Sequence, residues 1–137
     1  MEESIIENTK LITNKPLEEL IIEDTKIGTG QILQARDKII IHYTGTYIDQ
    51  DGEVVIFDSS VERKDPLRCR IGVGQLIRGW DVGLVGGKDY KFGPMSVGGK
   101  RKLIIPYMQA YGEEGRPPVI PAKTDLIFEV ELIEIEE

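Results

Sequence analysis

The fold of this protein depends on one stretch of its sequence, Gly74-Gln75-Leu76-Ile77-Arg78-Gly79-Trp80-Asp81, which contains the only tryptophan of the chain. Large apolar residues recur here at the steps of a short helix with one buried face, at Leu76, Ile77, Trp80 and Leu84. Most of the remaining sequence is typical of strands and turns. A single short helix among strands can bury its apolar face only if the sheet curls around it. We therefore predict that these residues form the floor of a concavity, and that the function lies there.

Trp80 has two interpretations at this point. An indole is large and flat, so Trp80 would make a good platform for a compact apolar ring. Aromatic residues on helical stripes are more often part of the core, in which case Trp80 only fills space. The periodicity alone leaves both interpretations open.

The composition excludes several classes of function. At 137 residues the chain forms one domain that can bury roughly two thirds of its unfolded surface. Its 24 acidic and 17 basic side chains give a net charge of -7, so the surface repels nucleic acids and anionic membranes. One cysteine, Cys69, excludes an internal disulfide, and one histidine, His42, argues against a zinc cluster. We expect no metal and no cofactor.

The start of the chain does not resemble a targeting segment. Residues 1–4 lack the basic and apolar regions of a secretory signal. No run approaches the roughly 20 apolar residues of a membrane span. We therefore expect a cytoplasmic protein that is a monomer and binds neither nucleic acid nor membranes.

Alternating apolar residues predict strands on both sides of the helix. The pattern is clearest at residues 38–47, where His42 and Tyr43 must face opposite sides of the sheet. The last strand alternates apolar residues with glutamates, which is typical of a sheet with one wet face. Further strands are expected at residues 17–27, 54–57, 67–71, 100–105 and 126–132, after an N-terminal extension of residues 1–16.

Two glycine-containing loops superficially match ligand-binding motifs. Residues 49–52 begin like a calcium loop, but the later ligands and the closing glutamate are absent. Residues 72–74 begin like a dinucleotide loop, but Ile77 stands where the third glycine belongs. We interpret the first as a hairpin turn and the second as the loop that leads into the helix.

Six separated segments occur in an order that identifies a family: His42-Tyr43-Thr44-Gly45, Phe57-Asp58-Ser59-Ser60, Gln75 to Trp80, Met95-Ser96-Val97-Gly98, Ala110-Tyr111-Gly112, and Ile120-Pro121 followed by residues 126–132. In this series the chain resembles the FKBP-type peptidyl-prolyl cis-trans isomerases, over residues 17–137. The resemblance implies an α+β fold in which a five-stranded antiparallel half-barrel sheet wraps around one short α-helix. It also implies that Trp80 is a binding floor.

The activity implied by the resemblance is rotation of X-Pro peptide bonds in polypeptides, which assists protein folding. The chain has no Ser-His-Asp set, reactive cysteine or metal cluster, and bond rotation needs none. The planar amide is more polar than the twisted transition state, so a dry pocket penalises the planar form more. Removing an unpaired amide from water costs roughly 2 to 7 kcal/mol, whereas one neutral hydrogen bond contributes about 0.5 to 1.5 kcal/mol. Apolar enclosure is therefore expected to dominate the rate.

The family motifs imply the residues of the pocket. Trp80 would lie under the proline ring, and the Tyr111 hydroxyl and the Ile77 backbone N–H would donate to substrate carbonyls. Asp58 would either orient Tyr43 while paired with Arg63 or only cap a turn. The implied catalytic residues are Tyr43, Asp58 and Tyr111, and the implied substrate-binding residues are Phe57, Leu76, Ile77, Trp80, Ile120, Phe128, Leu67, Cys69, Arg63 and Arg116.

The chain departs from the family pattern in three places. Leu67 and Cys69 stand where relatives often carry two aromatics, so one pocket wall is smaller and softer. Arg116 stands where many relatives carry another residue, which implies a changed preference for the residue before proline. Residues 86–93 resemble an insertion without an assigned role.

The chemistry leaves an alternative of a different class. A proline-recognising binding or chaperone module would hold a partner segment without useful turnover, and the missing aromatics are its best support. For either class, the resemblance implies that macrolide immunosuppressants occupy the pocket.

Overall fold

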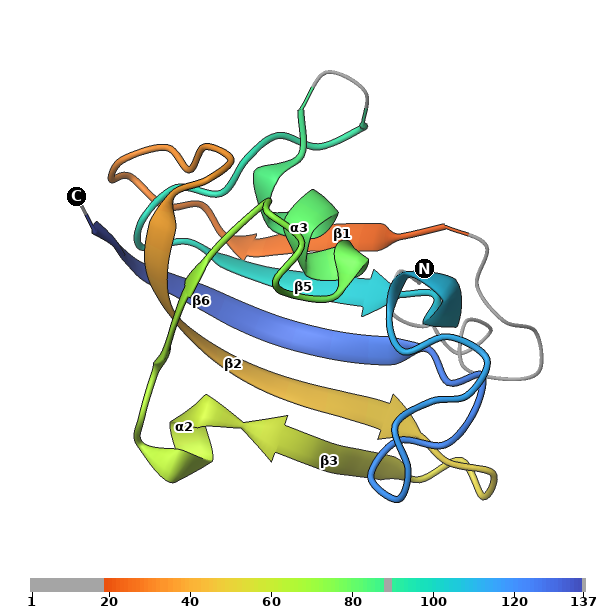
Figure 1. Cartoon of the computed structure of the whole chain (residues 1–137). Helices are drawn as coiled ribbons and strands as arrows, with labels where there is room; N and C mark the ends of the chain where they lie inside the picture. Colours follow the sequence, from red (N-terminus) through yellow and green to blue (C-terminus); the bar gives the residue numbers. More distant parts are fainter. Residues whose placement is uncertain (1–18, 88–89, 137) are drawn as a thin grey trace.

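The computed structural model describes residues 19–87 and 90–136. They form a curled antiparallel sheet with one helix of eight residues packed against a face of it (Figure 1). Within this part of the chain no helix is long and apolar enough to cross a membrane. The predicted extension, residues 1–16, lies outside the described residues, so the domain boundary at residue 17 stays a prediction.

Six strands make up the sheet, in the order β1-β5-β6-β2-β3, with β4 also paired to β2. The central pair, β2 and β6, joins the first half of the chain to its end. The strands are β1 (Ile21–Lys26), β2 (Lys38–Ile48), β3 (Val54–Ser59), β4 (Leu67–Arg70), β5 (Lys100–Ile105) and β6 (Leu126–Glu136), and the helical elements are α2 (Ser60–Arg63), α3 (Arg78–Val85) and the 3-10 turn η1 (Tyr107–Gln109).

Strands β3 and β4 share one position in the sheet. β4 pairs with residues 38–41 of β2, and β3 pairs with residues 44–48. The short helix α2 lies between them. The sheet therefore has five positions side by side, one of which is shared by β3 and β4, and the predicted five-stranded half-barrel is confirmed. No helix is predicted at α2 from the sequence, because its four residues are too few for a periodic pattern.

Helix α3 begins two residues later than the apolar pattern predicts. Ile77 is its N-cap, with an extended backbone (φ -61, ψ 149), and Leu76 and Ile77 lie in the preceding loop. Trp80 and Leu84 do lie on the buried face, at 3% and 0% exposure. The prediction that all four residues form one helical stripe is therefore wrong for the first two. A loop that packs against the same core as the following helix also needs apolar residues, so its sequence can look like an extension of the helical pattern.

The helix packs closely on β5 because two glycines face the sheet. A Cβ at Gly79 would lie 2.5 Å from Ile105 Cγ2, and a Cβ at Gly83 would lie 2.5 Å from Leu103 Cδ2. The helix backbone therefore lies directly against the side chains of β5, and the concavity opens on the side of Trp80. The fully buried core residues are Leu33, Ile39, Ile41, Ile71, Leu84, Leu103, Ile105, Leu126 and Leu132.

Candidate functional site

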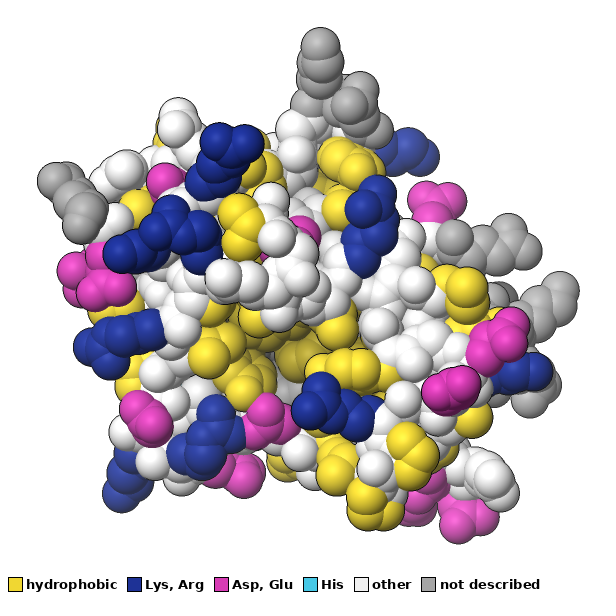
Figure 2. Space-filling model, in the orientation of Figure 1, with side chains coloured by type: hydrophobic (Ala, Val, Ile, Leu, Met, Phe, Trp, Pro, Cys, Tyr) yellow, Lys and Arg dark blue, Asp and Glu magenta, His cyan; other side chains and the backbone are white. Residues whose placement is uncertain are grey.

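A cleft of about 300 Å³ opens beside the first turn of α3. The space-filling view shows a hollow with hydrophobic side chains inside and charged side chains at its edge (Figure 2). The walls come from β2, β3, β4, β6, the loop before α3 and the loop after η1. The lining residues are Tyr43, Phe57, Asp58, Leu67, Gln75, Leu76, Ile77, Trp80, Tyr111, Arg116 and Phe128.

Four aromatic rings make the base of the cleft. Trp80 contacts Tyr43 and Phe128 edge to face, each with ring centroids 5.3 Å apart, at interplanar angles of 82° and 90°. Phe57 contacts Phe128 in the same way at 5.5 Å. Edge-to-face packing of this kind locks the rings against one another. The Trp80 Nε1 atom is buried and has no hydrogen-bond partner among the described residues.

A polar cluster lies against these rings. The Tyr43 hydroxyl donates to Asp58 Oδ2 at 2.5 Å, and Arg63 donates to Asp58 Oδ1 and, at 3.1 Å, to the Tyr43 hydroxyl. Burial raises the pKa of Tyr43, as does the Asp58 acceptor, while Arg63 lowers it. The phenol therefore remains a donor at neutral pH, and the carboxylate is held by two partners.

The sequence after Phe57 explains how Asp58 is positioned. Ser59 caps α2 by accepting the Glu62 N–H at 3.2 Å. Ser60 is fully buried, and its hydroxyl accepts the Tyr43 N–H at 2.7 Å. The Ser59 hydroxyl also pairs with the Thr44 hydroxyl of β2 at 2.9 Å. Both serines thus tie the end of β3 and the start of α2 to β2, which leaves Asp58 facing the Tyr43 hydroxyl.

Tyr111 and Arg116 come from the long loop between η1 and β6. The Arg116 guanidinium lies over the Tyr111 ring, 5.5 Å from its centroid. Backbone hydrogen bonds in both directions join Arg116 to Ile120, at 2.8 and 2.9 Å. Ile120 is 2% exposed and belongs to the core, so it anchors the loop from behind.

The cleft brings together most residues implied by the sequence, and three lie elsewhere. Arg63 reaches the site only through its bonds to Asp58 and Tyr43. Ile120 supports the loop without lining the cleft. Cys69 also does not line it, because it is two residues, or about 7 Å, further along β4 than Leu67. Burial, and then the charge of Asp81, raise the pKa of the Cys69 thiol to about 11.

Gln75 lines the cleft and was not predicted as a site residue. It is an exposed polar side chain in a loop, and neither periodicity nor charge distinguishes it. Its place directly before Leu76 in the family motif was the only available signal.

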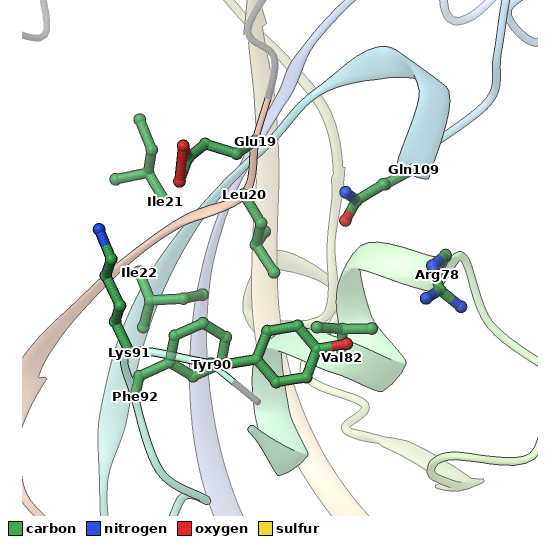
Figure 3. A pocket seen from close by; sticks show the side chains of 10 residues that line it. All are labelled: Glu19, Leu20, Ile21, Ile22, Arg78, Val82, Tyr90, Lys91, Phe92 and Gln109. Carbon is green, nitrogen blue, oxygen red and sulfur yellow. The ribbon is translucent and has the colours of Figure 1, made fainter. Parts of the chain in front are cut away.

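A larger hollow, of about 490 Å³, lies between β1 and the other side of α3. Figure 3 shows apolar side chains of both elements around it, together with the rings of Tyr90 and Phe92. These two rings stack at 5.5 Å and belong to the predicted insertion, of which residues 88–89 are not described. No hydrogen bond or ion pair joins the charged residues of its edge, Glu19, Arg78 and Lys91, to one another. Because the smaller cleft alone has a fixed polar cluster, we take it as the candidate site.

Comparisons with known proteins agree with this geometry. The family described as FKBP-type peptidyl-prolyl cis-trans isomerase matches residues 30–133. "Peptidyl-prolyl cis-trans isomerase FPR2" of Saccharomyces cerevisiae is 46% identical over 99 residues, which cover 72% of this chain and 65% of that protein. "FK506-binding protein 2" of Dictyostelium discoideum is 50% identical over 99 residues, with the same 72% and 65% coverage. The match thus spans slightly less than two thirds of each relative.

Among solved structures, the crystal structure of AtFKBP13 superimposes with a TM-score of 0.76 at 36% identity. The alignment covers 88% of this chain and 96% of that one. A structural alignment over this much of the chain confirms the predicted fold class. On the sequence match, the fold and the cleft together, the chain belongs to the family of FKBP-type peptidyl-prolyl cis-trans isomerases.

Proposed function

We propose that the cleft binds proline-containing segments of polypeptides and accelerates cis-trans rotation about their X-Pro bonds without covalent chemistry. The observation that carries the proposal is the floor of the cleft, where the Trp80 indole is held edge to face by Tyr43 and Phe128. A flat apolar floor between fixed walls fits a pyrrolidine ring and excludes water around it.

Exclusion of water is the main source of the rate enhancement. The uncatalysed rotation has a barrier of about 18 to 20 kcal/mol, because the planar amide is stabilised by resonance. The planar amide loses more hydration in a dry cleft than the twisted one. A differential effect of about 3 kcal/mol, within the range for desolvating an amide, accelerates rotation by more than about a hundredfold.

Two donors in the cleft support a defined pose of the substrate. The Tyr111 hydroxyl and the Ile77 N–H make no hydrogen bond with any other described residue. Both residues line the cleft, so the proposal assigns each to a substrate carbonyl. Asp58 holds the Tyr43 ring in place and transfers no proton, since rotation needs none.

A protease-free isomerisation assay with Leu-Pro and Phe-Pro peptides tests the proposal. Trp80→Leu removes the floor, and Asp58→Val removes the anchor of Tyr43, so we expect each to lower kcat/KM by at least about tenfold. Val54→Thr, at an exposed position of β3 (64% exposed), is the control and should retain full activity. Circular dichroism confirms that each variant is folded, and Trp80→Phe replaces Trp80→Leu if the latter is not. If micromolar wild-type protein leaves the isomerisation rate of the peptide at its uncatalysed value, the proposed enzymatic activity is rejected.

A binding or chaperone module is the second candidate. Leu67, an aliphatic residue, lines the cleft where relatives often carry an aromatic one, and Cys69 contributes nothing to that wall. A softer wall holds a proline segment less rigidly and gives less discrimination between the planar and twisted amide. Saturable binding of the peptide without acceleration of its cis-trans isomerisation would establish this candidate.

The proposal includes macrolide immunosuppressants as ligands of the same cleft. Its support is the printed name of the Dictyostelium relative, an FK506-binding protein, together with the shared cleft. The monomeric state, the cytoplasmic location and the absence of nucleic-acid and membrane partners stay predictions.

A further inference from the structure

The loop of residues 72–77 forms one wall of the cleft but has little structure of its own. Gln75, Leu76 and Ile77 of this loop line the cleft. Its two glycines adopt left-handed backbone conformations, with φ of +79 at Gly72 and +81 at Gly74. No side chain caps the helix that follows it. Such a segment does not keep one conformation unless another part of the molecule holds it.

Both ends of the loop are fixed by backbone contacts. At its start, Ile71 is fully buried, donates to the Asp37 carbonyl at 3.0 Å and accepts from the Arg36 N–H at 2.7 Å. At its end, the Ile77 carbonyl accepts the N–H groups of Trp80 and Asp81, at 3.0 and 3.3 Å. These contacts leave residues 72–76 to be held by something else.

One side chain holds the middle of the loop. The Asp81 carboxylate accepts the Gly72 N–H at 2.7 Å on one oxygen and the Gly74 N–H at 3.0 Å on the other. These are the only hydrogen bonds that residues 72–76 make with the described part of the chain. Charge-assisted bonds of this kind are about twice as strong as neutral ones. Asp81 itself does not line the cleft.

We propose that Asp81 is a positioning residue, which fastens the loop of residues 72–77 to α3 and so sets the cleft wall made by Leu76 and Ile77. Asp81 directly follows Trp80, so the same helical turn carries the floor and holds the wall. The inference rests on the function proposed above. It predicts an effect mainly on binding, because a loosened wall must be ordered again each time a substrate binds.

Asp81→Asn is the direct test, because it keeps the shape of the side chain and replaces one acceptor oxygen by a donor. We expect faster hydrogen exchange at the amides of Gly72 and Gly74, the two that donate to the Asp81 carboxylate. We also expect KM for a Leu-Pro peptide to rise about tenfold while kcat changes less than about twofold, as measured by NMR exchange at several peptide concentrations. Asp81→Glu keeps both oxygens and should recover most of the loss.

The hairpin between β2 and β3 provides a matched control. Asp49 also accepts two backbone N–H groups, from Asp51 and Glu53, both at 2.9 Å, and it lies away from the cleft. Both N–H groups bond to the same oxygen, Asp49 Oδ1, so Asp49→Asn keeps that acceptor and removes only the charge, whereas Asp49→Ala removes both contacts. Asp49→Ala should increase exchange at the amides of Asp51 and Glu53, and both variants should leave KM unchanged.

A second pair of variants avoids the carboxylate altogether. Gly74 and Gly52 have φ of +81 and +80, and a Cβ at either position would meet nothing within 4 Å. An alanine there adds only backbone strain. Gly74→Ala should therefore raise KM like Asp81→Asn, whereas Gly52→Ala, in the control hairpin, should not.

The results separate this inference from the proposed function. Faster loop exchange in Asp81→Asn with an unchanged KM would overturn the positioning role, as would equal effects of Asp49→Asn and Asp81→Asn on KM. If the wild-type protein binds the peptide without isomerising it, the proposed enzyme fails, and the dissociation constant of the same peptide decides the role of Asp81.

Discussion

The Tyr43 hydroxyl lies between two side chains of opposite charge. It donates a hydrogen bond to Asp58 at 2.5 Å, and Arg63 donates a hydrogen bond to the same hydroxyl oxygen at 3.1 Å. Together the two contacts hold the phenol in one orientation against the Trp80 ring. At this scale the site depends on a few short contacts rather than on any reactive group.

Cys69 allows a test at the same scale, because its pKa is raised from 9.0 to about 11 by burial and by Asp81. The native protein keeps the thiol proton up to higher pH than the unfolded chain does. This contribution to stability is therefore complete below pH 9 and is lost as the pH rises from 9 to 11.

Urea unfolding at a series of pH values measures the effect. Stability should fall more steeply between pH 9 and 11 in the wild-type protein than in Cys69→Ala, which cannot ionise there. Other groups, such as Tyr43, titrate equally in both proteins and cancel in the difference. Parallel curves would show that the thiol pKa is not raised.

Helix α3 lies close to β5 only because Gly79 and Gly83 have no side chains. Glycine costs an ordinary helix about 1 kcal/mol relative to alanine, so its presence twice in eight residues needs a reason. The reason is contact, since a Cβ at either position would overlap a buried side chain of β5. The depth of the helix in the sheet in turn sets the depth of Trp80 in the cleft.

A double-mutant cycle tests this packing. At Gly83→Ala the added methyl would lie 2.5 Å from Leu103 Cδ2, an overlap that costs about 1 to 3 kcal/mol. Alanine's higher helix propensity offsets about 1 kcal/mol of this cost, so we expect a net destabilisation of up to about 2 kcal/mol. In a Leu103→Ala background the methyl has room, so the same substitution should cost less or become favourable. Denaturant unfolding of the wild-type protein, the two single variants and the double variant gives the coupling free energy between positions 83 and 103. Additive effects within about 0.5 kcal/mol would mean that the helix shifts away freely.

At the scale of the whole molecule, the cleft exists because distant segments meet. Tyr43 on β2 and Phe128 on β6 have ring centroids 6.1 Å apart, although 85 positions separate them in the sequence. The pairing of β2 with β6 brings them together. A ligand that fills the cleft therefore contacts both halves of the chain and must stabilise the fold as a whole.

Macrolide binding should appear as this global stabilisation. A ligand at a hundred times its dissociation constant adds about 2.7 kcal/mol to the free energy of unfolding. We expect Tm to rise with the concentration of FK506, and the emission of Trp80, the only tryptophan, to change with the same midpoint. Asp58→Val keeps the fluorophore and should shift both midpoints to higher concentration. A rise in Tm without a change in Trp80 emission would place the ligand outside the cleft.

The sequence alone was sufficient for the elements whose signal is local. Alternation predicted β2 and β6, and their buried residues confirm it. β5 was predicted as the strand that ends before Pro106, and it has the predicted bounds of residues 100–105. The family motifs predicted most of the cleft, because they record which residue types the fold brings together. Local signals failed where a segment is short or lacks a period, as at α2 and Gln75.

Only the tertiary structure decided what depends on contacts between distant residues. Leu76 and Ile77 carry a helical period, yet they belong to a loop, because Asp81 holds that loop beside the helix. Arg101 carries a charge that usually marks a wet face, yet it is 3% exposed and paired with Asp24. Periodicity reports the preference of each residue for water or core, whereas the position of a loop or a buried charge follows from partners that the folded sheet supplies. The strands and the aromatic floor were thus determined by the sequence, and the shape of the cleft wall by the fold.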